Sequence, residues 1–169
     1  METNEMIQTN QFFTFMLGDE IFAIDISQIR EVLEFTNITK VPQTPDMMKG
    51  VINLRGSVVP VIDMRLKFGM GENEKTVDTC IVIIETMLDN NQTMIGALVD
   101  SVKEVMDLDS DHIEPAPKIG TQLNTAYIRG MGKHDGQFII ILDIDRIFSA
   151  SELEMAQQVG DPSPIAASA

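Results

Sequence analysis

The chain has 169 residues, enough for one domain or for two small lobes that pack closely together. Its formal net charge of −14 argues against a nucleic-acid partner and against anionic lipid, because both need a basic surface. The single cysteine excludes an internal disulfide, and the longest apolar runs have the length of strands, not of membrane spans. Residues 1–6 lack the basic and apolar parts of a signal peptide, so we expect a cytoplasmic protein without membrane insertion.

Apolar runs separated by turn residues predict short strands throughout the first half of the chain. Runs at 12–17 and 21–24 predict a hairpin. Residues 25–33 suit a helical turn followed by a strand, and the two prolines in 41–45 predict a loop. The remaining predicted elements of this half are strands at 51–54 and 58–62 and a short helix at 64–68.

The second half repeats this order. Residues 69–78 are polar and contain glycine, and we expect the chain to cross there from one lobe to the other. Runs at 80–85 and 94–99 predict another hairpin, and the prolines of 115–117 predict another loop. Residues 149–159 look helical, and the tail from residue 160 onward is expected to be disordered.

One segment returns eighty positions later without a gap. Gly50 matches Gly130, and the same offset relates Gly56 to Gly136, Asp63 to Asp143 and Phe68 to Phe148. Such self-similarity predicts one supersecondary unit built twice. Each of the two aspartates directly precedes a predicted helix, so we expect both to be helix N-caps. Many short strands with closely spaced turns therefore predict two small antiparallel barrels that lean on one another.

The sequence lacks the residue patterns of an enzyme or of a metal protein. Cys80 begins an apolar run, where a thiol is usually a small buried hydrophobe, and we expect His112 and His134 to be solvated. Residues 107–111 begin like a calcium loop, but the glycine and glutamate that such a loop requires are replaced by His112 and Lys118. We therefore expect no catalytic residue, no cofactor and no metal site.

Arg55 lies at the tip of a predicted hairpin and has no equivalent in the second copy of the segment. An arginine at such a tip is placed to make a forked hydrogen-bond contact with a partner. The alternative is an ion pair with one of the many acidic residues of the chain. On spacing alone, the two interpretations are equally supported.

The motifs around Arg55 resemble a known family. They comprise the segments 50–56 and 58–63, preceded by 29–32 and by the loop at 41–45, and matched in the second half by 96–100 and 115–117. Over residues 12–150 the chain resembles the CheW-like family of bacterial chemotaxis coupling proteins.

The resemblance implies a mainly β protein of two SH3-like five-stranded antiparallel β-barrel lobes packed together, with short helices. Residues 12–150 would form one CheW-like domain, with lobe one at about 12–70 and lobe two at about 78–150. Residues 1–11 would be a flexible tail, and 151–169 a helix followed by a disordered tail. The implied function is a non-enzymatic adaptor that links the cytoplasmic tips of methyl-accepting chemoreceptors to the regulatory domain of the histidine kinase CheA, recruited to arrays at the membrane.

The resemblance also implies two binding surfaces. A receptor hairpin would dock in the groove between the lobes, and the matching residues are Ile29, Glu31, Gly50, Arg55 and Val105. Kinase contacts would come from Ile26 in the first lobe and Ile119 in the second. A different interpretation is a self-assembling structural module of a signalling array, because barrels with open strand edges can stack.

Overall fold

The computed structural model describes residues 11–71, 74–88, 91–108, 113–114 and 127–148. Its strands are β1 (Gln11–Leu17), β2 (Glu20–Asp25), β3 (Ile29–Glu34), β4 (Met48–Leu54), β5 (Ser57–Asp63), β6 (Cys80–Leu88), β7 (Asn91–Val99), β8 (Ser101–Asp107), β9 (Ile128–His134) and β10 (Gln137–Leu142). The described residues also form three short helices: the 3-10 helix η1 (Ile26–Gln28), α2 (Met64–Lys67) and α3 (Ile144–Ile147). The predicted C-terminal helix and tail lie outside the described residues, as does the predicted N-terminal tail except for Gln11, which begins β1.

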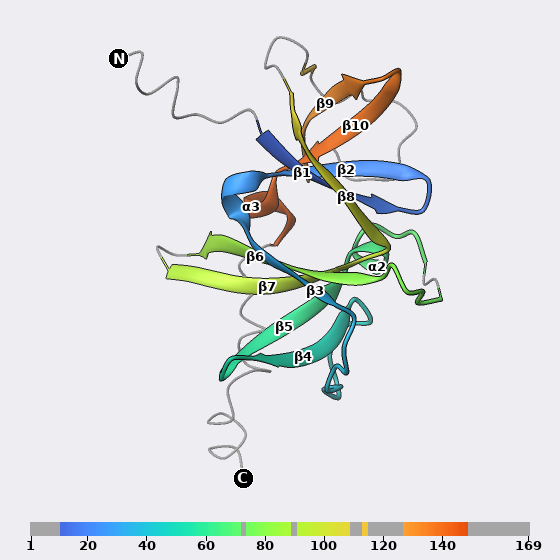
Figure 1. The fold of residues 1–169 in the computed structure, drawn as a ribbon. Helices are drawn as coiled ribbons and strands as arrows, with labels where there is room; N and C mark the ends of the chain where they lie inside the picture. Colours follow the sequence, from blue (N-terminus) through green and yellow to red (C-terminus); the bar gives the residue numbers. More distant parts are fainter. Residues whose placement is uncertain (1–10, 72–73, 89–90, 109–112, 115–126, 149–169) are drawn as a thin grey trace.

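The strands form two five-stranded sheets (Figure 1). Lobe A has the order β8-β1-β2-β10-β9, and lobe B has the order β3-β6-β7-β5-β4. The prediction of a mainly β protein with two packed five-stranded lobes is confirmed. Each sheet also contains one parallel pair, β2 with β10 in lobe A and β5 with β7 in lobe B, which the sequence did not indicate.

The predicted division into lobes at about 70 and 78 is wrong, because neither lobe is a continuous half of the chain. Strands β1 and β2 pair with β8 and β10 in lobe A, while β3, β4 and β5 join β6 and β7 in lobe B. The described chain crosses between the lobes through η1, and again at Asp100 between β7 and β8. Residues 69–78, where we expected the crossing, connect two parts of lobe B instead.

The predicted repeat is confirmed as a structural duplication. Strands β4 and β5 and helix α2 recur as β9, β10 and α3, with boundaries that correspond across the eighty-residue offset. A bridge from Thr39 to the edge strand β4 at Val51 has its counterpart between Glu114 and Met131 on β9. If each of β1–β5 is replaced by its equivalent among β6–β10, and the reverse, the strand order of lobe A becomes that of lobe B. Each lobe therefore contains a hairpin from the opposite half of the chain.

Side chains alternate between the two faces of each strand, and this places the hydrophobic residues in three cores: one inside each lobe and one between the lobes. On β6, Ile81 and Ile83 pack inside lobe B, whereas Val82 and Ile84 face the interlobe core. Successive side chains of a strand point to opposite faces, so one strand serves both cores. The interlobe core also receives Phe15 and Phe22 from lobe A, and both lobes therefore fold as one packed unit.

The two predicted N-caps differ. Asp63 is buried, and its Oδ1 accepts hydrogen bonds from the backbone N–H groups of Arg65 at 2.9 Å and Leu66 at 3.3 Å, so its prediction as a cap is confirmed. Asp143 precedes α3 at the matching position, but its side chain makes no capping bond, and that prediction is wrong. Its Oδ2 lies 3.5 Å from Nε of Arg146, a cation that stands where the first copy has Leu66.

Candidate partner-binding site

The two strands that begin at the chain crossings carry exposed apolar side chains. On β3, Ile29 packs against the interlobe core, and Val32, which pairs with the core residue Val82, is 40% exposed. On β8, Val102 packs against the same core, and Val105, which pairs with Phe13, is 48% exposed. We call Ile29, Val32, Val102 and Val105 the interlobe surface.

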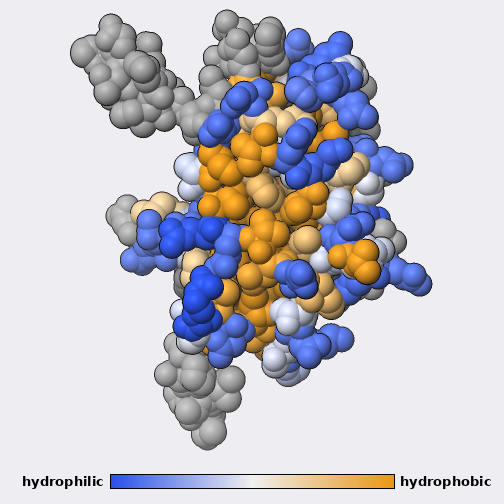
Figure 2. Space-filling view, viewed as in Figure 1, coloured by the Kyte–Doolittle hydropathy of each residue, from blue (hydrophilic) through white to orange (hydrophobic). Residues whose placement is uncertain are grey.

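The figures place these strands on one face of the molecule. Both β3 and β8 run across the front in Figure 1, β8 over lobe A and β3 over lobe B. Figure 2, drawn from the same side, shows hydrophobic side chains in a band down the middle of this face, with hydrophilic residues on both sides of it. An apolar band with a polar border is typical of a protein-binding surface.

Arg55 and Glu31 form an ion pair on lobe B. The guanidinium makes two contacts with the carboxylate, one from Nη1 to Oε1 at 3.4 Å and a closer one from Nη2 to Oε2. The hydrogen bond and positive charge of Arg55 lower the pKa of Glu31, and Glu31 correspondingly raises the pKa of Arg55. The structure thus shows the ion pair with an acidic residue, which was one of our two interpretations of Arg55. The Arg55 side chain is nevertheless 72% exposed.

The backbone at Arg55 is unfavourable for an arginine. Arg55 and Gly56 form the two-residue turn between β4 and β5, with φ values of 51° and 92°. Such turns prefer asparagine or aspartate before glycine, and the second copy has Asp135-Gly136 with φ values of 52° and 79°. A long side chain in the left-handed region costs free energy, and such strain tends to occur at functional positions.

Gly50 is buried within lobe B. Its φ is 145°, and a Cβ at this position would lie 2.8 Å from Cγ2 of Ile38 and even closer to the backbone carbonyl of Thr39. The glycine therefore lets the backbone at Thr39 approach β4 closely. It does not itself present a surface for contact.

The two residues predicted as kinase contacts are Ile26 and Ile119. Ile26 belongs to η1 and packs, partly buried, against the interlobe core. Ile119 lies outside the described residues. Sequence reasoning missed Val32 and Val102, although each lies three residues from a predicted contact on the same strand. Residues three apart on a regular strand point to opposite faces, and only the bulges in β3 and β8 bring these pairs to one face.

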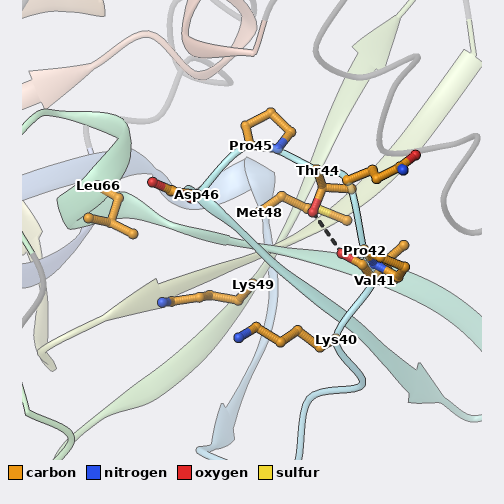
Figure 3. Close-up of a pocket in the computed structure, with 10 residues that line it drawn as sticks. Lys40, Val41, Pro42, Thr44, Pro45, Asp46, Met48, Lys49 and Leu66 are labelled. Atoms are coloured by element: carbon orange, nitrogen blue, oxygen red, sulfur yellow. Dashed lines mark hydrogen bonds between the residues drawn. The ribbon is translucent and has the colours of Figure 1, made fainter.

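A wide cleft of about 710 Å³ lies in lobe B, beside the loop that connects β3 to β4 (Figure 3). It is lined by residues of that loop together with Met48, Lys49 and Leu66. The Lys40 and Lys49 side chains extend in the same direction in Figure 3, and Lys49 Nζ lies 3.9 Å from Asp63 Oδ2. None of the predicted receptor or kinase contacts that the structure describes lines this cleft.

Other kinds of site have little support in the described residues. Among them, no group of three or more His, Cys, Asp or Glu side chains could hold a metal ion. Burial raises the pKa of the Cys80 thiol, which disfavours the reactive thiolate. No helix in the described part of the chain is both long and apolar enough to span a bilayer.

Comparison with known proteins agrees with this architecture. The CheW-like domain family matches residues 11–152. The chain belongs to the CheW-like family. It is 37% identical to a chemotaxis protein CheW of Klebsiella aerogenes over 152 residues, which covers 88% of this chain and 87% of the relative. A chemotaxis protein CheW of Helicobacter pylori is 34% identical, with 86% of this chain and 84% of the relative covered.

A solved structure of a CheW-like protein has the same fold. The crystal structure of the scaffolding protein TtCheW from Thermoanaerobacter tengcongensis superposes with a TM-score of 0.75 at 35% identity, over 86% of this chain and 91% of that chain. The resemblance read from residues 12–150 is therefore confirmed. This CheW-like chain is a member of a chemotaxis scaffold family, and that membership favours binding surfaces over catalytic sites as its functional features.

Proposed function

We propose that this protein is a cytoplasmic, non-enzymatic chemotaxis adaptor that links the tips of methyl-accepting chemoreceptors to the regulatory domain of the histidine kinase CheA. It brings kinase activity under receptor control and is recruited to receptor arrays at the membrane. The observation that carries this proposal is the interlobe surface, whose exposed valines lie on β3 and β8, together with the Glu31–Arg55 pair, of which Glu31 also lies on β3, on a chain of a chemotaxis scaffold family.

The receptor is assigned to the interlobe surface on physical grounds. A helical hairpin that presents spaced apolar side chains can bury them against a surface whose exposed members are valines. Val32 and Val105 supply area to bury, while the Glu31–Arg55 pair offers charged atoms that fix register and orientation. Gly50 contributes indirectly, because it shapes the strand that leads to the Arg55 turn.

Kinase contacts are assigned to Ile26 and, by position in the sequence, to Ile119, which lies outside the described residues. Ile26 lies in the crossing helix η1, at the opposite end of β2 from the β1–β2 turn. Its partial exposure leaves apolar area for a partner, while its packing on the interlobe core fixes its position. Separate surfaces are what an adaptor needs if it binds both partners at once.

Size-exclusion chromatography with light scattering tests the proposal. The chain is mixed with a receptor cytoplasmic fragment, with the CheA regulatory domain, and with both. We expect binary complexes and one ternary complex of the summed masses. Failure to bind either partner contradicts the adaptor function.

Self-assembly is the second candidate, and a specific observation favours it. Val58 and Phe138 occupy matching positions in the two copies of the repeat, and they are 50% and 62% exposed. Two equivalent apolar positions, one on each lobe, are suited to contacts between copies of the chain. In the same experiment, a mass that grows with the concentration of the chain alone supports this candidate.

A further inference from the structure

Asp100 occupies one of the two places where the described chain crosses between the lobes, and its side chain contacts both lobes. Its Oδ2 accepts a hydrogen bond from the backbone N–H of Gly18 in the β1–β2 turn of lobe A, at 2.7 Å. The same oxygen accepts one from Nη1 of Arg65, on helix α2 of lobe B, also at 2.7 Å. One carboxylate oxygen therefore joins three segments that are far apart in the sequence.

The neighbours of Asp100 hold this junction in place. Its backbone N–H donates to the carbonyl oxygen of Met16 at 3.1 Å, and Arg65 Nε donates to the carbonyl oxygen of Gly71 at 2.9 Å. The side chains of Arg65 and Asp100 are only 15% and 26% exposed. A charge-assisted hydrogen bond of this geometry, shielded from water, is stronger than a pair at the surface.

The other crossing has an aspartate as well, but it contacts one lobe only. Asp25 Oδ1 accepts hydrogen bonds from the backbone N–H and the hydroxyl of Ser27, within the crossing itself. Its Oδ2 lies 3.7 Å from Nη1 of Arg129, on β9 of lobe A. Among the described residues, the Asp25 side chain makes no hydrogen bond or ion pair with lobe B, so the Asp100 crossing is the one whose side chain connects the two lobes.

We propose that the contact of Asp100 with Arg65 and Gly18 is a lock that fixes the angle between the lobes, and with it the position of β8 relative to β3. Strand β8 begins at the residue after Asp100 and carries Val102 and Val105, whereas β3 begins at the other crossing and carries Ile29 and Val32. The lock thus sets the spacing across the interlobe surface. Asp100 and Arg65 are positioning residues in this scheme, because neither belongs to that surface.

The lock has a consequence for binding that rests on the proposed function. A rigid surface is already shaped for its partner, and a surface whose parts can shift loses affinity because binding must order it again. Loosening the lock should weaken receptor binding about tenfold. CheA binding through Ile26 should change little, because the crossing at η1 keeps its own contacts.

The lobe angle is measured directly by double electron–electron resonance. Spin labels are placed at Gln92 on lobe B and Gln137 on lobe A, two exposed residues, in a chain with Cys80→Ser. Asp100→Asn keeps an oxygen that can accept the hydrogen bond of Gly18 but removes the negative charge. Arg65→Lys keeps the positive charge but loses the planar guanidinium that donates to both Asp100 and Gly71. Asp25→Asn makes the same chemical change at the other crossing and is the matched control.

We expect Asp100→Asn to broaden the distance distribution between the labels and Arg65→Lys to broaden it less. The Asp25→Asn distribution should match that of the parent chain. Distributions as narrow as the parent for both Asp100→Asn and Arg65→Lys overturn the lock. A broadened distribution with unchanged receptor affinity supports the lock and contradicts the placement of the receptor on the interlobe surface.

Discussion

The guanidinium of Arg55 binds the carboxylate of Glu31, so that two of the side chains assigned to the receptor from the sequence act as one charged unit on lobe B. Arg55 achieves this from a turn position with a φ of 51°, where the second copy of the hairpin has Asp135. The Arg55 side chain is well exposed and that of Glu31 is partly exposed, so the pair adds little to folding, since ion pairs open to solvent stabilise proteins weakly. Its role is therefore better sought in recognition than in stability.

Replacing Arg55 separates these two roles. We expect Arg55→Ala to weaken binding to a receptor fragment about tenfold, with a nearly unchanged thermal midpoint. Arg55→Asn should weaken binding similarly and raise the thermal midpoint, because asparagine adopts the left-handed conformation more easily. Isothermal titration and thermal unfolding measure the two effects.

The control for Arg55 is Arg30, another exposed arginine of lobe B. Its Nη1 lies 3.3 Å from Oε1 of Glu85, and its side chain is 57% exposed. Arg30→Ala removes an ion pair of the same kind and should leave receptor affinity unchanged. Unaltered affinity in both Arg55 variants would contradict the assigned role.

The pH dependence of the pair follows from the lowered pKa of Glu31. Arg55 stabilises the ionised carboxylate, so Glu31 titrates below its ordinary value of 4.5 in the folded chain. The associated stabilisation is complete above the unfolded pKa and is lost as the pH falls through the folded pKa. NMR titration of the carboxyl carbon should show the lowered midpoint, and Arg55→Ala should raise it. A midpoint that the substitution does not move would show that the pair is absent in solution.

Gly50 should behave as a structural residue. An added Cβ would collide with the Thr39 backbone in a conformation that alanine avoids, so Gly50→Ala should lower the free energy of unfolding by about 3 kcal/mol. Gly56 also has a positive φ, but no atom lies within 4 Å of the added Cβ, and Gly56→Ala should cost only about 1 kcal/mol. Urea unfolding compares the two. Equal effects would show that close packing at Thr39 is not what requires Gly50.

The two matched aspartates should also differ. Asp63→Ala removes two capping bonds and should cost about 1 kcal/mol, while Asp143→Ala should cost clearly less because its side chain caps nothing. Chemical denaturation of both variants provides the comparison. A larger loss for Asp143→Ala than for Asp63→Ala would contradict the difference that the structure shows.

Local features of the fold could be predicted from the sequence, but the partition of strands between lobes could not. The hairpins, η1 and the repeat follow from turn residues, periodicity and spacing, which act over a few residues. The pairing of β2 with β10 joins segments more than a hundred residues apart, and neither strand carries a local signal for it. A strand that is apolar on both faces can be buried in either lobe, so its sequence does not indicate which lobe it joins.

The same limit applies to the site. Arg55 could be singled out from the sequence because the second copy of the repeat has no arginine at the matching position. Val105 could be singled out because of the family resemblance. The ion pair with Glu31 depends on bringing the β4–β5 turn beside β3, and the lock at Asp100 depends on the exchange of strands between the copies. Both are products of tertiary arrangement, which periodicity does not encode.

The separation of the two binding surfaces is tested by a reciprocal pair of charge insertions. Val105→Glu places a carboxylate in the exposed apolar band and should reduce receptor binding at least about tenfold while sparing CheA. Ile26→Glu should reduce CheA binding by a similar factor while sparing the receptor. Because Ile26 also packs against the interlobe core, its variant is compared with Ile26→Ala by thermal unfolding before binding is measured. If the two glutamate variants lose the opposite partners, or both lose the same one, the assignment of the receptor and the kinase to these surfaces is wrong.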